Sequence, residues 1–381
     1  MNFIRKLKSA IQRAVGLNRI SFVVIVLGIY FLGGSVIAAI LRMINLAHAL
    51  IFIVAFSTFL GSGLYLKSKV KGTGSELELM LEMGSFKMIL VQFIAILKSR
   101  LNVIILYTWP AISSLIIASN KLPTIIELLK LFLSITFVGY SVYLYNDIMD
   151  LNNDLKNKEF GNPVPANRPL GSGKIRLKLF KKFTIFLASI GLLVASLINI
   201  YIFTLQLINI LLGILYSTEP IRLKKRFLAK QMTIIISVIL SILSGALTVG
   251  IFNINILYLI LINSSLIITN TILLDISDLR GDMITGIKTI PAVLGPHLSI
   301  KITILINIFI IISSLIGYLK LEFNILLPII IIPVILTYIH DLYRVLNKWM
   351  DPIFITNVIY KKLIPISILM QLSIILGKIK I

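Results

Sequence analysis

Cysteine, histidine and acidic residues are absent or scarce in this chain. It has no cysteine and only three histidines, which stand far apart at His48, His297 and His340. Disulfide bonds and thiolate metal sites are therefore excluded, and a metal site built from clustered histidines is not expected. Asp and Glu number only 15, against 37 Lys and Arg. Any place where several carboxylates gather is consequently informative.

Hydrophobic sequence, in contrast, is abundant. Hydrophobic residues make up 58% of the 381 residues, more than one soluble core would bury. A helix that crosses a bilayer needs about 20 apolar residues, and the alternating segments of about 10 residues that typify a membrane barrel are not visible. The sequence therefore predicts an all-α, multi-pass integral membrane protein. The apolar runs, nine after residue 100 and two before it, lie near 21–41, 46–66, 101–119, 124–145, 183–199, 201–216, 229–250, 254–274, 299–317, 324–340 and 354–377.

The basic residues follow the loops between these runs. The formal net charge is +22, but Lys and Arg concentrate in every second loop rather than on one surface, which argues against nucleic acid as a partner. By the positive-inside rule, the basic loops face the cytoplasm. Asp341 and Asp351 are expected to be ordinary loop charges, and Lys361 and Lys362 interrupt the last apolar run. The basic loops are 1–20, 67–100, 155–182, 217–230, 279–301 and 341–353.

The predicted organisation has two parts. Residues 1–75 form a basic N-terminal segment, a hairpin of two transmembrane helices and a linker with Gly and Ser. Residues 76–381 form a core of nine helices. A cleavable signal peptide is disfavoured because the first apolar run is about as long as a full span, whereas the apolar region of a signal has about 7–15 residues.

Two acidic clusters hold six of the 15 acidic residues. Within each cluster the carboxylates are three, four and seven positions apart, so on a helix they share one face. Oxygen ligands suit Mg²⁺, and a carboxylate near hydrocarbon needs a compensating charge. Two facing clusters with Mg²⁺ between them would hold a diphosphate at the cytoplasmic ends of two apolar helices. The clusters read Asn146-Asp147-Ile-Met-Asp150-Leu-Asn-Asn-Asp154 and Asp275-Ile-Ser-Asp278-Leu-Arg-Gly-Asp282.

Cations and aromatic rings accompany the clusters. Arg168 and Lys288 each lie in a loop with Gly and Pro a few residues past a cluster, so both are interpreted as phosphate ligands, whereas Lys178 is interpreted as a cytoplasmic anchor. Tyr140 and Tyr143 precede Asp147 by seven and four positions. A ring face there would stabilise a carbocation, although such aromatic stripes more often pack against other helices.

These motifs resemble those of the UbiA superfamily of intramembrane prenyltransferases. Members carry Asn-Asp-x-x-Asp-x-x-x-Asp after the second core helix and Asp-x-x-Asp-x-x-x-Asp after the sixth, and both motifs occur here at those positions. The similarity covers about residues 90–377 and includes Trp109-Pro110. The loop 216–224 is similar to that of chlorophyll synthases. The run 278–291 is similar to the branch that contains chlorophyll synthases, homogentisate and naphthoate prenyltransferases and archaeal ether-lipid enzymes.

The resemblance implies Mg²⁺-dependent transfer of a prenyl group from a polyprenyl or geranylgeranyl diphosphate to a lipid-soluble acceptor, with release of diphosphate. The acceptor would be a quinone precursor, an aromatic ring or a lipid headgroup. Enzymes of the family that act on 4-hydroxybenzoate have an Arg where this chain has Leu151, which argues against that acceptor. Lys174 or Arg222 could, however, take over the role of the missing Arg. The positions that match metal ligands are Asn146, Asp147, Asp150, Asp154, Asp275, Asp278 and Asp282; those that match substrate contacts include Arg168, Lys224, Lys288 and Tyr216.

Two other functions are compatible with intramembrane carboxylates. A transporter uses them along an ion pathway, but here they lie at helix ends beside loops suited to phosphate. A terpene cyclase of the same superfamily would capture the carbocation within its own chain. The sequence leaves the donor chain length, the acceptor and the oligomeric state open.

Overall fold

The computed structural model describes residues 85–119, 122–159, 169–170, 175–284 and 286–378. The chain separates into two units, Met1–Met88 and Ile89–Ile381, and nearly all of the described residues belong to the second. The predicted N-terminal hairpin lies outside the described residues. The boundary predicted between residues 75 and 76 stays a prediction.

The described part of the chain is helical, with no strand. Two short segments, η1 and η3, are π-helical, and η2 is a 3₁₀ turn. The elements are α5 Ser85–Ser99, η1 Ile104–Thr108, α6 Trp109–Ala118, α7 Ile125–Glu159, α8 Leu177–Ser196, α9 Ile200–Ser217, η2 Leu223–Lys225, α10 Ala229–Thr248, α11 Ile254–Ser277, α12 Leu279–Ile284, α13 Ile290–Leu294, α14 Pro296–Lys320, α15 Leu326–Lys348, α16 Pro352–Val358, η3 Ile359–Leu363 and α17 Ile364–Gly377.

The membrane spans of the core agree with the predicted apolar runs. In the described residues, eight helices are long and apolar enough to cross a bilayer, and the bent pair Gln92–Ser99 and Ile104–Ala118, with an angle of 53°, makes up to nine. The short run at 201–216 is helix α9. The run that Lys361 and Lys362 interrupt continues through η3 as one span, Pro352–Gly377. The prediction of an all-α integral membrane protein is confirmed.

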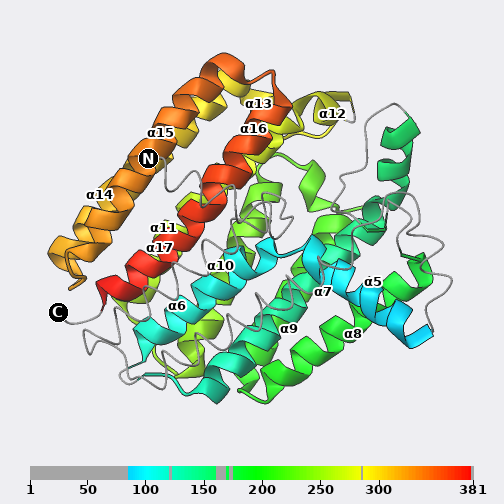
Figure 1. Cartoon of the computed structure of the whole chain (residues 1–381), viewed down its shortest axis with the longest axis horizontal. Coiled ribbons are helices and arrows are strands. Elements are labelled where there is room, and N and C mark those ends of the chain that lie inside the picture. Colours follow the sequence, from blue (N-terminus) through cyan, green and yellow to red (C-terminus); the bar gives the residue numbers. More distant parts are fainter. Residues whose placement is uncertain (1–84, 120–121, 160–168, 171–174, 285, 379–381) are drawn as a thin grey trace, which may run out of the picture. The chain divides into compact units, whose positions relative to one another are not determined.

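The helices pack in a bundle in which α10 and α11 lie between two groups (Figure 1). Helices α7, α8 and α9 pack on one another, and α14 packs on α15. Small residues permit close approach, as is common between membrane helices. A Cβ atom at Gly245 of α10 would collide with the carbonyl oxygen of Ala111 in α6, and one at Gly191 of α8 would lie 2.8 Å from the Val138 side chain of α7.

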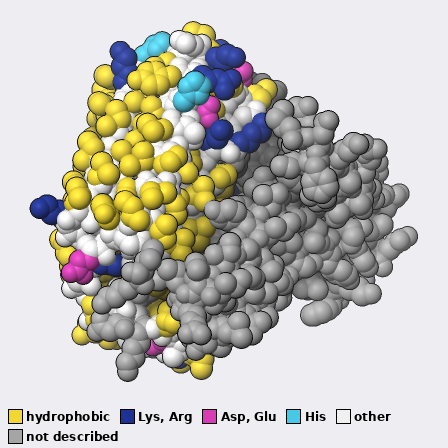
Figure 2. Space-filling model, turned by 60° about the vertical axis from the view of Figure 1, so that its left-hand side comes forward, with side chains coloured by type: hydrophobic (Ala, Val, Ile, Leu, Met, Phe, Trp, Pro, Cys, Tyr) yellow, Lys and Arg dark blue, Asp and Glu magenta, His cyan; other side chains and the backbone are white. Residues whose placement is uncertain are grey.

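The surface of α14 and α15 is apolar over most of its height. Leu305 and Leu319 of α14 and Ile329 and Leu336 of α15 are all more than half exposed. Figure 2 shows hydrophobic side chains covering this face, with most of the charged side chains gathered at one end. Exposed hydrocarbon of this extent is expected where a helix meets lipid.

Asp341 is not a loop charge, so that prediction is wrong. It lies within α15, only 6% exposed, and forms ion pairs with Arg344 and Lys362 at 3.4 Å each. A carboxylate inside a membrane helix requires such partners, and the pair offsets one of the two lysines in the last span. Asp351 does lie between helices, where its Oδ1 accepts a hydrogen bond of 3.0 Å from the backbone N–H of Phe354 and caps α16.

Candidate active site

The first acidic cluster lies on one continuous helix. Helix α7 runs on to Glu159, although its apolar span ends at Leu151, so the cluster stands where the helix leaves the membrane rather than where the helix ends. The predicted shared face is present: Asn146 Nδ2 donates to Asp150 Oδ2 at 3.1 Å, one turn away. The side chain of Asp154 lies outside the described residues.

Asp150 is surrounded by cations from the loop after α9. The Lys224 ammonium binds Asp150 Oδ1 and also donates to Asn146 Oδ1 at 3.0 Å. Arg222 Nη2 donates to the same Asp150 oxygen at 3.1 Å. Ser217 Oγ completes the surroundings of Asn146 by donating to its Oδ1 at 3.1 Å. Lys224 and Arg222 therefore both contact Asp150, while the predicted role of Lys224 in binding substrate stays a prediction.

Asp147 has a different partner. Arg100, which follows α5 and is 9% exposed, donates through Nε to Asp147 Oδ2 at 3.2 Å and through Nη2 to Oδ1. The Arg100 guanidinium also lies 5.4 Å from the ring centroid of Tyr143. Tyr143 Oη is 3.3 Å from Tyr107 Oη, so Arg100 and two tyrosines form one wall of the site. Tyr140 instead packs in the core, where its hydroxyl donates to the carbonyl of Leu97 at 2.6 Å.

The second cluster does not lie on one continuous helix, contrary to the spacing argument. Helix α11 ends at Ser277, Asp278 is its C-cap, and α12 begins at Leu279. Asp275 is fully buried and binds the Lys230 ammonium, while Gln231 Nε2 donates to its Oδ2 at 2.7 Å. Asp278 is exposed and Asp282 is half-buried. Across this break the backbone N–H of Asp282 still donates to the Asp278 carbonyl at 3.0 Å, so the three carboxylates stay in one short segment.

Burial raises the pKa of Asp282 to about 7, and the nearby carboxylates of Asp275 and Asp278 act in the same direction, whereas Lys230 opposes them. With a pKa of about 7, the Asp282 carboxyl group is partly protonated at neutral pH. The second cluster thus brings three carboxylates close enough to influence one another.

Tyr216 joins the two clusters. It stands at the end of α9 and interacts electrostatically with Asp150 of the first cluster and with Asp275 and Lys230 at the second. Tyr107 interacts with Tyr216 as well. The predicted place of Tyr216 at the wall of a shared site stays a prediction. Lys288 is exposed, and its backbone N–H donates to the Lys225 carbonyl at 3.3 Å, which holds its loop beside η2.

Sequence reasoning missed Arg100, Lys230 and Gln231. Arg100 and Lys230 lie in predicted basic loops, where the positive-inside rule alone explains a Lys or Arg. Nothing in the sequence therefore marked these two residues as partners of a carboxylate. The partners also stand 44 to 47 positions from the carboxylates that they bind. Arg168 and Lys174 lie outside the described residues, so their predicted contacts stay predictions.

In the described part of the chain, no three side chains among Asp, Glu and His form a ready metal site. A cation nevertheless stands among the expected ligands: the Lys224 ammonium lies between Asn146 Oδ1 and Asp150 Oδ1. The same pair of oxygens is the kind that Mg²⁺ prefers. The donor set of the first cluster therefore fits a cation.

The family profile described as UbiA prenyltransferase family matches residues 107–355. The chain belongs to this family. It is a multi-pass membrane prenyltransferase, which confirms the resemblance of the motifs and disfavours a transporter.

Among its relatives are two archaeal proteins named digeranylgeranylglyceryl phosphate synthase. The protein of Saccharolobus solfataricus is 32% identical over 219 residues, which cover 55% of this chain and 73% of the relative. The protein of Sulfurisphaera tokodaii is 28% identical over 205 residues, which cover 53% and 70%.

Solved structures of the family share the fold. A digeranylgeranylglyceryl phosphate synthase structure superposes with a TM-score of 0.57 and 27% identity, over 78% of this chain and 100% of that one. A UbiA homologue from Archaeoglobus fulgidus bound to DMAPP and Mg²⁺ gives 0.55 and 18%, over 74% and 97%. At this identity, the second likeness supports the fold alone.

Proposed function

We propose that this protein transfers a geranylgeranyl or similar prenyl group from its diphosphate to the hydroxyl group of a lipid-soluble glyceryl phosphate, with Mg²⁺ as cofactor. The relatives named digeranylgeranylglyceryl phosphate synthase support the acceptor class, and membership of the UbiA prenyltransferase family supports a prenyl donor. The oxygen ligands of the two acidic clusters support Mg²⁺. The observation that carries the proposal is the set of ion pairs in which Arg222 and Lys224 bind Asp150 and Lys230 binds Asp275, one carboxylate in each of the two acidic motifs.

The metal would be held by oxygen ligands of both clusters. In the structure the Lys224 ammonium lies between Asn146 Oδ1 and Asp150 Oδ1, where a divalent ion would bind. If the ion displaces the ammonium, Lys224 would bind the diphosphate instead. When bound, Mg²⁺ offsets the charge that grows on the departing diphosphate. The proposed ligand set is Asn146, Asp150, Asp154, Asp275, Asp278 and Asp282, with Asp147 as a further member that Arg100 holds in place.

After the metal binds, the cations of the site would bind the diphosphate. Lys224, Arg222 and Lys230 each lie on a carboxylate that the metal would neutralise, so they become available for phosphate oxygens without leaving the site. Hydrogen-bond donors fixed around a leaving group stabilise the transition state most where water is excluded. Arg168, Lys174 and Lys288 are proposed to complete this shell from the two loops.

The proposed reaction makes one carbon–oxygen bond and breaks another. The bond between C1 of the prenyl chain and the diphosphate oxygen breaks, and its electron pair leaves with the diphosphate. The acceptor hydroxyl oxygen bonds to C1, and its proton passes to the diphosphate. Tyr143 and Tyr107, whose ring centroids lie 6.1 Å apart in an edge-to-face arrangement, are proposed to line this position, where a ring stabilises positive charge and excludes water.

The proposal is tested with the purified full chain, geranylgeranyl diphosphate and glyceryl phosphate bearing one geranylgeranyl ether. We expect a product with two chains and equimolar diphosphate, both abolished by EDTA and restored by Mg²⁺. Lys178→Ala, at a lysine outside the site, is the matched control and should react normally. A cyclised hydrocarbon or alcohol formed without acceptor would instead identify a cyclase. No diphosphate release with any prenyl diphosphate would refute the proposal.

We further propose that the site faces the cytoplasm, which rests on the basic loops at that side. Because the chain has no cysteine, single cysteines report topology without background. Lys178→Cys should be shielded from a membrane-impermeant thiol reagent in intact cells, and Glu322→Cys should be labelled. The reverse pattern would contradict this orientation.

A further inference from the structure

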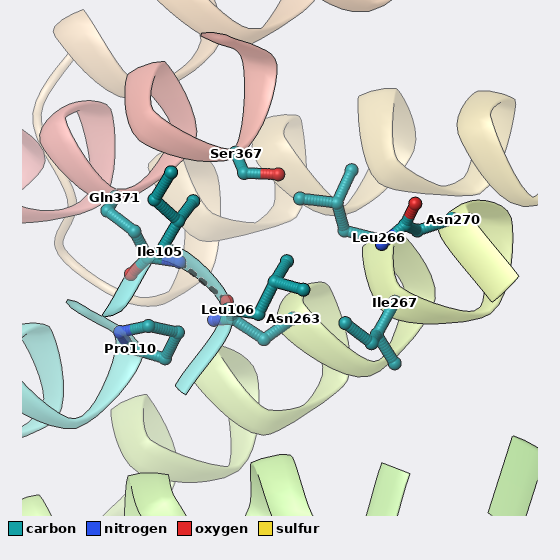
Figure 3. Close-up of a pocket in the computed structure, with 9 residues that line it drawn as sticks. All are labelled: Ile105, Leu106, Pro110, Asn263, Leu266, Ile267, Asn270, Ser367 and Gln371. Carbon is teal, nitrogen blue, oxygen red and sulfur yellow. Dashed lines mark hydrogen bonds between the residues drawn. The ribbon is translucent and has the colours of Figure 1, made fainter. Parts of the chain in front are cut away.

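The interior pocket shown in Figure 3 is too small for most ligands. It lies between η1, α6, α11 and α17 and has space for about one water molecule. The outer surface offers a more open polar region, because the charged side chains of the α14–α15 face gather at one end (Figure 2). From the last turns of α15 through α16 into η3, the chain carries four exposed basic residues, Arg344, Lys348, Lys361 and Lys362.

Three of these cations are held together by one carboxylate and one aromatic ring. Arg344 Nη1 and Lys362 Nζ each lie 3.4 Å from an oxygen of Asp341, the first from Oδ1 and the second from Oδ2. The Arg344 guanidinium and the Lys348 ammonium lie 5.5 and 5.3 Å from the centroid of the Phe354 ring. Asp341 is buried, whereas the three cations are exposed. Arg344, Lys348 and Lys362 thus form one surface group, called here the α15–η3 basic group.

The α15–η3 basic group carries more charge than its carboxylate neutralises. Three cations on the single carboxylate of Asp341 leave a net charge of +2. Asp351 also lies in this part of the chain, but it caps α16 and forms no ion pair with any described residue. Arg344 and Lys348 stand four positions apart on α15, where like charges repel each other. An anion bound beside them would remove this repulsion.

The α15–η3 basic group lies at the depth of the lipid headgroups. Arg344 follows the first residue of α15 by 18 positions, which is about 27 Å along the helix. Lys362 precedes the last residue of α17 by 15 positions, or about 23 Å. The hydrocarbon core is about 30 Å thick, and the long stems of Arg and Lys bridge the remaining few ångströms. Both cations therefore reach the headgroup layer on one side of the membrane.

A role as ordinary topological anchors does not account for this arrangement. Lys178 and Lys181, at the start of α8, are exposed and form no ion pair with any described residue, which is sufficient for an anchor. The α15–η3 basic group is instead fixed on a carboxylate that is buried within a membrane helix, which is unfavourable unless it has a purpose. Basic pockets between membrane helices bind anionic lipid headgroups.

We propose that Arg344, Lys348 and Lys362 bind the phosphate of an anionic membrane lipid. Arg344 uses only Nη1 on Asp341, so its other N–H groups are available to phosphate oxygens, and the two ammonium groups add point charges. Asp341 and Phe354 are positioning residues. Among the described residues, none of the three cations pairs with a carboxylate of either acidic cluster, so the lipid site is independent of the proposed function.

The test is native mass spectrometry of the full chain in detergent, titrated with phosphatidylglycerol and with phosphatidylcholine of the same acyl chains. A basic residue near an anionic surface strengthens binding about fivefold, so a net charge of +2 predicts about a 25-fold preference for phosphatidylglycerol. Lys348→Gln leaves both contacts of Asp341 intact and should reduce the preference to about fivefold. Arg344→Gln combined with Lys348→Gln should abolish it; if that variant does not fold, Lys348→Gln decides.

A variant matched in charge is the control. Lys178→Gln combined with Lys181→Gln removes the same charge from another basic region and should keep the full preference. Equal binding of the two lipids by the wild type, or an equal loss in the control, would overturn the inference. Inorganic phosphate at the concentration of the lipid should leave the lipid bound. Displacement by phosphate would show a site for soluble anions and would overturn the assignment to a lipid.

Discussion

The two acidic clusters have the same spacing and unlike surroundings. Asp150 in the first is bound by two cations, Arg222 and Lys224, whereas Asp275 in the second has one, Lys230, together with the neutral Gln231. The first cluster keeps to one helix and the second crosses the break between α11 and α12. The difference indicates that Asp150 is shared between two cations, whereas the buried Asp275 depends on a single one.

The largest effect is expected at the centre of the first cluster. Asp150→Asn removes the carboxylate that both Lys224 and Arg222 hold, so we expect kcat to fall by about 10³-fold, in the range of losses that follow removal of one stabilising group. Diphosphate release under saturating donor measures it. Asp351→Asn, which changes a carboxylate outside the site, serves as the control. Near-normal turnover of Asp150→Asn would contradict the proposed role of this cluster.

The second prediction concerns stability and distinguishes the clusters directly. Lys230→Met leaves a fully buried Asp275 without its cation, and removal of one partner from a buried pair costs about 3–5 kcal/mol. Lys224→Met should cost clearly less because Asp150 keeps Arg222. Thermal unfolding of both variants in the same detergent provides the comparison. Equal losses would mean that the number of cations does not distinguish the clusters.

A smaller effect is expected at Arg100. Arg100→Lys keeps the charge near Asp147 but loses the two-point contact, so the concentration of Mg²⁺ for half-maximal turnover should rise about tenfold. Arg100→Gln should raise it further. Binding of Mn²⁺ in the absence of substrate should weaken in parallel. Unchanged metal dependence in both variants would limit Arg100 to packing.

The smallest effect is expected at Lys288. Its side chain is exposed, so Lys288→Ala should raise the KM for the donor only severalfold, and added salt should reduce the difference. Lys178→Ala should change neither the KM for the donor nor its dependence on salt. A loss as large as that of Asp150→Asn would show that the loop of Lys288 closes over the donor.

The span positions were predictable because hydrocarbon thickness imposes a length on each apolar run. Even the short run 201–216 forms a helix of 18 residues, α9, which is long enough to be a candidate span. Pairings were not predictable, because Arg100 with Asp147 and Lys362 with Asp341 join residues far apart in the sequence. The break at Asp278 was missed because helical spacing says nothing about where a helix ends.

The central claim is that both clusters hold metal around one diphosphate. Electron paramagnetic resonance of Mn²⁺ bound with an unreactive thiolo analogue of geranylgeranyl diphosphate tests it most directly. We predict a spin-coupled pair of ions in the wild type, and a single uncoupled ion in both Asp150→Asn and Asp278→Asn. A single ion in the wild type, or a coupled pair that survives in either variant, would contradict the account.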